Sequence, residues 1–296
     1  MPTGIARGIR SVQIGLVVNA ALAIIKLVAG IVGNTYALIA DAVESTTDIF
    51  SSMIVWGGLR VAARDPDEAY PFGYGKAEAL AASFVSLMLV GAAFFITIEA
   101  AREIRTPHRT PAPWTLIVLV AVMLIKWTLS RSVHTVGTDI HSTAVQADAW
   151  HHMSDAITSA AAFVGISIAL LGARFAGGSG WAQADDWAAV LAAIVIFYNG
   201  VRMLRPAMHD LMDRAPGSEF LDQVRRAAVS IEGVLATEKL FIRKTGTSYR
   251  VTIHVHADPR LPLRDAHILG GKVKSAIRSA VPQVHSVLVH MEPYGE

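Results

Sequence analysis

Residues 41–48 read DAVESTTD, and residues 148–155 repeat the pattern as DAWHHMSD. Both stretches lie in segments apolar enough to cross a bilayer, and their polar residues recur at spacings of three and four, which place them on one face of a helix. The two faces carry Asp41, Glu44 and Asp48, and Asp148, His151 and Asp155. Because a charged group at bilayer depth costs on the order of 2.5 to 3.5 kcal/mol on insertion scales, such clusters require a cation or a water-filled cavity. The pattern indicates a metal path through a membrane.

The composition supports a membrane protein and limits the residue types that could bind a metal. The 296 residues are 53% hydrophobic and 17% charged, a balance that soluble proteins rarely have. The 26 basic and 24 acidic side chains leave a net charge of +2, which argues against a nucleic-acid partner. Since the chain has no cysteine, a metal must be held by carboxylate, imidazole, carbonyl or water.

The apolar segments predict six membrane-spanning helices, each about 20 residues or longer. Their ranges are 12–33, 38–60, 78–100, 114–134, 143–171 and 185–205. Six spans put both termini on one side of the lipid bilayer. Eight Arg and Lys residues flank the spans on that side against four on the other, so we expect both termini in the cytoplasm. The expected location is a bacterial inner membrane.

Composition changes after Pro206, where apolar runs shorten to strand length. We therefore divide the chain into a transmembrane domain, residues 1–207, and a soluble domain, residues 208–296. In the second, Ser218 is a candidate helix cap, and Thr245-Gly246 marks a hairpin turn. The predicted elements are a helix over 218–231, strands over 239–244 and 249–256, a helix over 263–281 and a strand over 284–291. This order predicts a small α+β sandwich.

Five segments together resemble the cation diffusion facilitator family of metal transporters. They are NTYALIADAVESTTD (34–48), YPFGYGKAE (70–78), ADAWHHMSD (147–155), LMDR (211–214) and VHMEP (289–293). The resemblance covers nearly the whole chain. It implies an α-helical membrane protein with six spans and a cytoplasmic ferredoxin-like domain of order αββαβ. It also implies a homodimer that exchanges a divalent metal cation for protons by alternating access.

The resemblance implies that Glu44, Asp48, His151 and Asp155 are the transport ligands. Glu44 departs from the family, which more often has Asp or His there. The resulting three carboxylates and one imidazole make a hard site, which leaves Zn²⁺, Fe²⁺, Co²⁺ and Mn²⁺ as candidates. Zn²⁺ is expected first from its frequency in the family. Because the ligands must lose protons to bind metal, metal and proton fluxes are predicted to be coupled.

Two acids and one histidine border these ligands. Asp41 and Asp148 lie one turn before them, where second-shell groups orient ligands; helix capping or exposure at the span mouth is the alternative. His152 points about 100° away from His151 and is a poor simultaneous ligand.

The loop after the second span and the domain junction carry two further predictions. Some family members bind a second metal in this loop through an Asp and two His, where this chain has Asp67, Tyr70 and Tyr74. Phenols are poor ligands for these cations, so we predict that this site is missing. The resemblance further implies an ion pair between Lys76 and Asp213 that holds the dimer closed; an ordinary interfacial lysine is the alternative.

Histidines gather in the soluble domain. By resemblance, His254, His267, His290 and Glu292 match metal-sensing positions of the family, and a single regulatory ion is expected. Solvated or fold-supporting imidazoles are the alternative.

Two other classes of function compete with transport. A membrane-embedded metal-dependent hydrolase would need an open coordination position, but all four ligand places are taken and no HExxH motif is present. A membrane-anchored metal sensor would lose all function without its soluble domain. We therefore expect a transporter and not an enzyme, with no cofactor beyond the transported and regulatory metal ions.

Overall fold

The structure is a computed structural model that describes residues 3–32, 36–104, 115–175 and 184–295. The chain divides into two compact units, Met1–Met208 and His209–Glu296. The boundary falls in the last turn of the sixth long helix, close to the predicted change of composition at Pro206.

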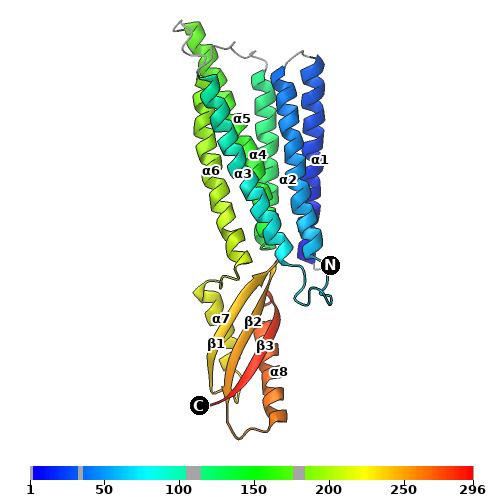
Figure 1. Cartoon of the computed structure of the whole chain (residues 1–296), viewed down its shortest axis with the longest axis vertical. Helices are drawn as coiled ribbons and strands as arrows, with labels where there is room; N and C mark the ends of the chain where they lie inside the picture. Colours follow the sequence, from blue (N-terminus) through cyan, green and yellow to red (C-terminus); the bar gives the residue numbers. More distant parts are fainter. Residues whose placement is uncertain (1–2, 33–35, 105–114, 176–183, 296) are drawn as a thin grey trace. The chain divides into compact units, whose positions relative to one another are not determined.

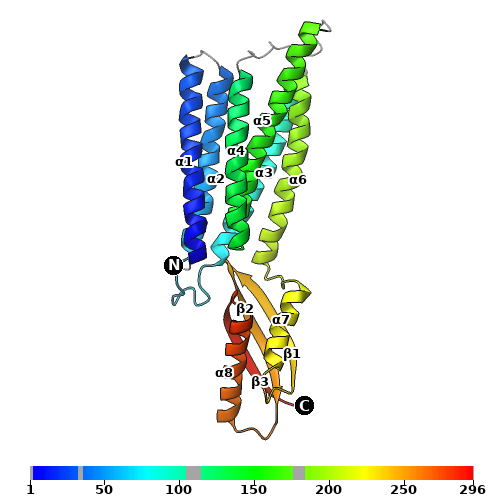
Figure 2. The ribbon, with the colours of Figure 1, turned by 180° about the vertical axis from the view of Figure 1, so that it is seen from behind.

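The first unit is built from long helices that run side by side (Figures 1 and 2). They are α1 (Thr3–Val32), α2 (Tyr36–Ala62), α3 (Lys76–Glu103), α4 (Thr115–Asp139), α5 (Thr143–Phe175) and α6 (Ala184–Leu211). Most of them extend several residues beyond the predicted spans, because backbone hydrogen bonding continues a helix past its apolar part. Each acidic stretch lies within one helix, α2 or α5, as its three- and four-residue spacing predicts.

Within the described residues, four helices contain a segment long and apolar enough to cross a membrane. These segments are Gly4–Ile25 in α1, Lys76–Arg102 in α3, Leu116–Asp139 in α4 and Trp187–Leu211 in α6. The six-span prediction is thus supported for four helices. The crossing of α2 and α5, which carry the acidic stretches, stays a prediction.

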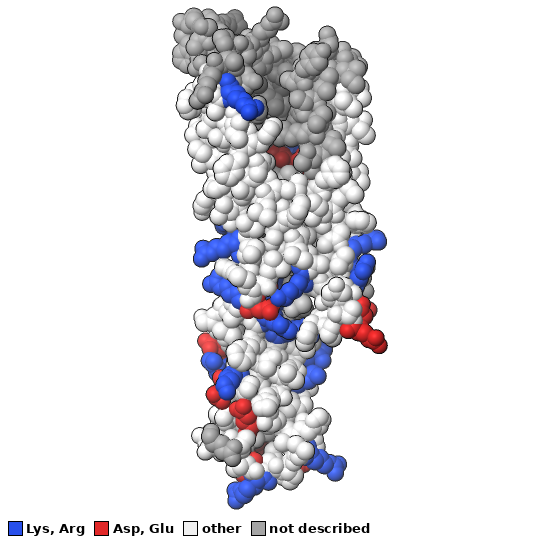
Figure 3. Space-filling model, in the orientation of Figure 1, with Lys and Arg blue, Asp and Glu red and all other residues white. Residues whose placement is uncertain are grey.

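The helical unit exposes apolar side chains and buries polar ones, the reverse of a soluble bundle. Ile25 on α1, Phe95 on α3 and Leu191 on α6 are each more than 60% exposed. Figure 3 shows a mostly uncharged surface over these helices, with basic side chains gathered towards one end. The buried polar residues include Asn19, Asp48, Ser52, Lys126, Asp148, His151 and His152. Such an arrangement suits a bundle with lipid outside and a polar site within.

Small residues bring α2 and α3 into close contact. A Cβ atom added at Gly58 would lie 2.5 Å from Ala81 Cβ and 3.1 Å from the Ala77 carbonyl oxygen, whereas one added at Gly57 would meet nothing within 4 Å. Close approach through small residues is a common way for membrane helices to pack.

We expect Gly58→Ala to lower thermal stability, because the added methyl group must push the backbone of α3 away. Overpacking of this kind costs about 1 to 3 kcal/mol. Thermal unfolding in detergent, followed by tryptophan fluorescence, measures the effect, and Gly57→Ala is the matched control. Equal melting temperatures for the two variants would show that this contact does not limit stability.

The second unit is a three-stranded sheet with both helices on one face (Figures 1 and 2). Its elements are α7 (Ser218–Val229), β1 (Ala236–Thr245), β2 (Ser248–Ala257), α8 (Leu263–Ala280) and β3 (Val284–Pro293). β2 lies in the centre, antiparallel to β1 and parallel to β3. The element order is the predicted one, because each strand alternates apolar and polar residues and each helix has one apolar face.

The core of this unit lies between the sheet and the two helices. Val224 of α7 and Val273 of α8 pack with Val251, Ile253 and Val255 of β2. The alternate side chains of β2 therefore point to the opposite face, which the helices leave uncovered.

The predicted hairpin turn at Thr245-Gly246 is present, whereas the predicted helix cap at Ser218 is not. Gly246 has a φ of +63° in the tight connection from β1 to β2, a conformation that favours glycine in short hairpins. The cap prediction for Ser218 was wrong. α7 begins at Ser218 itself, and its cap residue is Gly217, in extended conformation and without a side-chain capping bond.

Candidate functional site

The helical unit brings Asp48 of α2 together with His151 and Asp155 of α5. One potential ligand atom from each residue lies within 4.8 Å of the others, and His151 Nε2 is 3.1 Å from Asp48 Oδ1. Asp48 and His151 are buried, while the Asp155 side chain is 21% exposed. Two carboxylates and an imidazole at these separations form a candidate cation site, and its most exposed member is Asp155.

A lysine from a third helix completes this cluster. Lys126 Nζ of α4 lies 2.7 Å from Asp48 Oδ2 and 2.7 Å from Asp155 Oδ2, and its side chain is 1% exposed. Its ammonium group therefore bridges the two acids. The sequence prediction missed this residue, although a charged side chain in the middle of an apolar segment is a functional candidate by default.

The side chains of Glu44 and Asp41 lie outside the part of the chain that the structure describes in detail. Both residues belong to helix α2, with Glu44 one turn before Asp48. Glu44 as the fourth ligand and Asp41 as its supporting group therefore stay predictions.

A second buried polar layer borders the cation site. Ser52 of α2 donates a hydrogen bond of 3.1 Å to Asp148 Oδ1 of α5, and His152 Nε2 lies 3.6 Å from Asp148 Oδ2. All three side chains are fully buried. Asp148 thus ties α5 to α2 one helical turn from the contact between Asp48 and His151.

His152 lies outside the gathered ligands, in line with its predicted direction. Its ring is 6.0 Å from that of His151 and turns towards α1, where a Cβ added at Gly15 would lie 3.1 Å from His152 Nε2. A glycine at this point makes room for the imidazole between α1 and α5.

The soluble unit gathers a second set of potential ligands on the uncovered face of its sheet. His254 Nδ1 shares a hydrogen bond of 2.7 Å with Glu292 Oε1, and His290 Nε2 lies 3.6 Å from the same oxygen. β2 and β3 are paired so that His254 stands opposite His290. The hydrogen bond from His254 holds the pKa of Glu292 below its usual value, so this carboxyl group is ionised at neutral pH and available to a cation.

A second cluster of potential ligands, formed by His256 and Glu238, also includes the Glu292 side chain. His256 Nε2 lies 3.3 Å from Glu292 Oε2 and 3.6 Å from Glu238 Oε2 of β1. In regular alternation with Leu240, which packs on the core, Glu238 would point towards the helices. An irregularity between Thr237 and Leu240 shifts the register and brings Glu238 to the open face.

His267 does not join these groups in the described part of the chain. It is exposed on α8, whose apolar side packs against the sheet face opposite to His254 and His290. His267, which the resemblance placed with His254, His290 and Glu292, therefore does not meet them within one chain, because strand alternation points the strand ligands away from the helices.

We expect Glu292→Gln to weaken metal binding by the soluble unit more than any single histidine change there, because Glu292 belongs to both groups. Titration of the full-length protein with Zn²⁺ or Mn²⁺ should lose the sites assigned to this unit. His285→Ala is the matched control, since His285 is exposed at the far end of β3. Unchanged binding stoichiometry in Glu292→Gln would contradict the assignment.

The loop before α3 is held by its own hydrogen bonds. Tyr74 donates a bond of 2.6 Å to Asp67 Oδ2, and the Tyr70 amide donates one of 2.7 Å to Asp67 Oδ1. These bonds, that from Tyr74 above all, lower the pKa of Asp67. Both oxygens of Asp67 therefore accept hydrogen bonds from Tyr70 and Tyr74. That this loop lacks the second metal site stays a prediction.

The predicted ion pair between Lys76 and Asp213 would join the two units and stays a prediction. Within the second unit, Asp213 accepts a hydrogen bond of 3.4 Å from Arg243, and Asp210 accepts one of 2.8 Å from Lys244. β1 is thereby fastened to Asp210 in the last turn of α6 and to Asp213 just after that helix.

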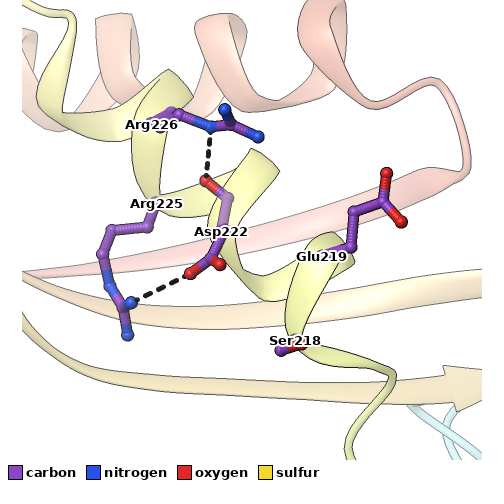
Figure 4. Close-up of a pocket in the computed structure, with 5 residues that line it drawn as sticks. All are labelled: Ser218, Glu219, Asp222, Arg225 and Arg226. Atoms are coloured by element: carbon purple, nitrogen blue, oxygen red, sulfur yellow. Dashed lines mark hydrogen bonds and ion pairs between the residues drawn. The ribbon is translucent and has the colours of Figure 1, made fainter.

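A surface hollow beside α7 offers no comparable site. Figure 4 shows its lining residues, among which Arg225 donates to the Asp222 carboxylate and Arg226 to the Asp222 carbonyl. Bonds between residues three and four apart are ordinary on a solvated helix face. The contacts in this hollow therefore do not indicate a binding site.

Apolar helices around buried acids and an imidazole, followed by a soluble unit rich in histidine, define a membrane protein that handles metal cations. Two family models match the chain: the cation efflux transmembrane domain over residues 12–212, and the cytoplasmic domain of cation efflux proteins over residues 216–294. The chain belongs to the cation diffusion facilitator family. It is a divalent metal cation efflux transporter.

Similar proteins span nearly the same length. The manganese efflux system protein MneP of Bacillus subtilis is 27% identical over 96% of this chain and 95% of its own. The magnetosome protein MamB of Magnetospirillum gryphiswaldense is 26% identical over 92% and 89%. The cation-efflux pump FieF of Yersinia pestis is 27% identical over 92% and 88%. A solved MamM C-terminal domain is 21% identical, with a TM-score of 0.25, over 25% of this chain and 94% of that one.

Proposed function

We propose that this transporter exchanges a divalent metal cation for protons, and that Asp48, His151 and Asp155 bind the metal together with Glu44. The observation that carries the proposal is the convergence of the first three residues from two helices, with ligand atoms within 4.8 Å of one another. Such donors must be deprotonated to hold a cation, so loading releases protons and emptying takes them up. Exposure of the site to each side in turn then couples metal efflux to a proton gradient.

The proposal includes α2 and α5 as membrane-crossing helices. They are 27 and 33 residues long, enough to cross a hydrocarbon core, and each packs with helices that contain apolar spans. The described acids Asp48, Asp148 and Asp155 are tolerated because they gather inside the bundle with polar partners from neighbouring helices. With six crossings both termini lie on one side, which we assign to the cytoplasm of a bacterial inner membrane.

The donor set suits several metals. Three carboxylates and one imidazole accept Zn²⁺, the metal expected from family frequency, and equally favour the harder Mn²⁺ and Fe²⁺. One relative is named a manganese efflux protein. We therefore propose a site for Zn²⁺, Mn²⁺, Fe²⁺ or Co²⁺, and the assay must rank all four.

We further propose that the protein is a homodimer regulated by a metal ion at His254, His290 and Glu292. On the same open face of the sheet, Phe241 and Leu288 are more than 60% exposed, which offers apolar surface to a second copy. An ion bound beside this surface would favour one arrangement of the dimer.

A transport assay in sealed liposomes tests the proposal. Purified protein is challenged with Zn²⁺, Mn²⁺, Fe²⁺ or Co²⁺ under an imposed pH step, with one dye that reports metal and another that reports pH. We expect metal flux with proton movement in the opposite direction. When an ionophore collapses the pH step, the metal flux driven by that step should be lost. Metal flux without any proton movement would disprove the exchange. Substrate hydrolysis without flux would support the metal-dependent hydrolase instead.

A further inference from the structure

The ammonium group of Lys126 lies between two of the carboxylates that we propose as metal ligands. It lies 2.7 Å from one oxygen of Asp48 and 2.7 Å from one oxygen of Asp155. Zinc bound to the same two oxygens would lie about 2.0 to 2.2 Å from each. A metal held between these two oxygens would take the place of the ammonium group, because two cations cannot stand side by side in the same gap. Metal binding at these oxygens therefore requires the ammonium group to move away from at least one of them.

Lys126 differs from a lysine that anchors a helix at the membrane surface. Such lysines stand near helix ends and extend their charge towards water. Lys126 lies near the middle of α4, between apolar residues, and its side chain is 1% exposed. By contrast, Arg131 on the same helix is exposed and stacks on Trp127 at 4.3 Å. The bundle directs the charge of Lys126 inward, onto the two acids.

The chemistry of lysine suits reversible occupation of a cation site. Its charge is a compact ammonium group on a flexible four-carbon stem, whereas the arginine guanidinium is a planar fork that holds carboxylates in two parallel bonds. An ammonium group can withdraw by rotation about its stem and return without any change of covalent structure. A guanidinium would hold the acids more firmly.

We propose that Lys126 is a tethered counter-cation that bridges Asp48 and Asp155 in the empty transporter, offsets part of their negative charge and competes with the arriving metal for them. The inference rests on the proposed function, since it takes these acids as metal ligands. While the metal is absent, the ammonium group keeps two carboxylates from standing uncompensated at membrane depth. During release, the ammonium group returns to the carboxylates and replaces the metal there, which favours its departure. Lys126 therefore lowers metal affinity and speeds release.

Equilibrium metal binding at fixed pH tests this role. Calorimetric titration with Mn²⁺ or Zn²⁺ alone is carried out on the full-length chain in nanodiscs, with Glu292→Gln as background to remove binding by the soluble unit. We expect Lys126→Met to bind about tenfold more tightly or better, because a competing charge-assisted interaction is lost. Stopped-flow chelation should show slower metal release. Lys126→Arg should bind more weakly than the wild type.

The matched control is Arg131→Met, which removes one positive charge from the same helix outside the site and should leave affinity unchanged. Folding of each variant is checked by gel filtration, and if Lys126→Met does not fold, Lys126→Arg alone decides. Weaker or unchanged binding in folded Lys126→Met, or unchanged or tighter binding in Lys126→Arg, overturns the inference. A purely structural clamp would give the first of these results.

Asp155→Ala separates failure of this inference from failure of the proposed site. If Asp155→Ala abolishes binding while the Lys126 variants match the wild type, the metal site stands and the counter-cation role falls. If Asp155→Ala binds as the wild type does, the site itself is misplaced, and the inference falls with it.

Discussion

Asp155→Ala is expected to reduce divalent metal flux in liposomes to the level of protein-free vesicles. Asp155 supplies a carboxylate from α5 to the gathered cluster and is its most exposed member, so the substitution removes a ligand from the proposed site. The remaining donors of the proposed site, Asp48, His151 and Glu44, leave the cation one protein ligand short of a closed four-ligand site. We expect the same loss of flux for His151→Ala.

The experiment requires a variant that inserts and folds but does not transport. Lys126 keeps Asp48 as a partner when Asp155 is removed, so the bundle should remain intact. Gel filtration and the thermal unfolding profile check this. Asp139→Asn is the control, because this acid lies exposed at the end of α4 and pairs with Arg7 outside the site. Wild-type flux through folded Asp155→Ala would exclude this cluster as the transport site.

Asp148→Ala is expected to lower metal affinity by about 10- to 100-fold, the usual effect of removing a group that orients a ligand. Asp148 is fully buried and accepts the hydrogen bond from Ser52, so it fixes α5 against α2 beside the contact of His151 with Asp48. Without this bond the two ligand-bearing helices can shift relative to each other. Titration with Mn²⁺ or Zn²⁺ in the Glu292→Gln background measures the loss.

The conservative variant distinguishes positioning from charge. Asp148→Asn keeps a carbonyl oxygen that can accept the Ser52 bond, so it should recover most of the affinity, and Ser52→Ala should resemble a mild form of Asp148→Ala. If Asp148→Asn is as defective as Asp148→Ala, the charge of Asp148 matters more than its hydrogen bond. Asp148 would then act on the metal directly.

Several features could be predicted because they follow from local periodicity. The three- and four-residue spacings of 41–48 and 148–155 predicted which side chains share a helix face, and the described members Asp48, His151 and Asp155 do converge. Alternation along a strand likewise places His290 and Glu292, two residues apart on β3, on one face, whereas the pairing of β3 with β2 was needed to bring His254 beside them. The relations within one helix or one strand depend only on 3.6 residues per helical turn and two per strand repeat.

Other features lay beyond any local pattern. Glu238 reaches His256 only through a register irregularity in β1, and regular alternation would point it the other way. His267 carries a suitable side chain but stands on a helix that covers the wrong face of the sheet. The partnership of Ser52 with Asp148 joins residues 96 positions apart. Each depends on which elements pack together.

The sequence by itself determined the candidate donors of the proposed transport site and the helix faces that carry them, because donor chemistry and helical period are properties of the chain. Only the tertiary structure showed that the ammonium group of Lys126 contacts two of those donors. Lys126 has no partner at helical spacing on α4, and its role appears only when α4 packs beside α2 and α5 and brings its ammonium group to Asp48 and Asp155. The electrostatic balance of the site is set by three helices in contact, and no single segment contains it.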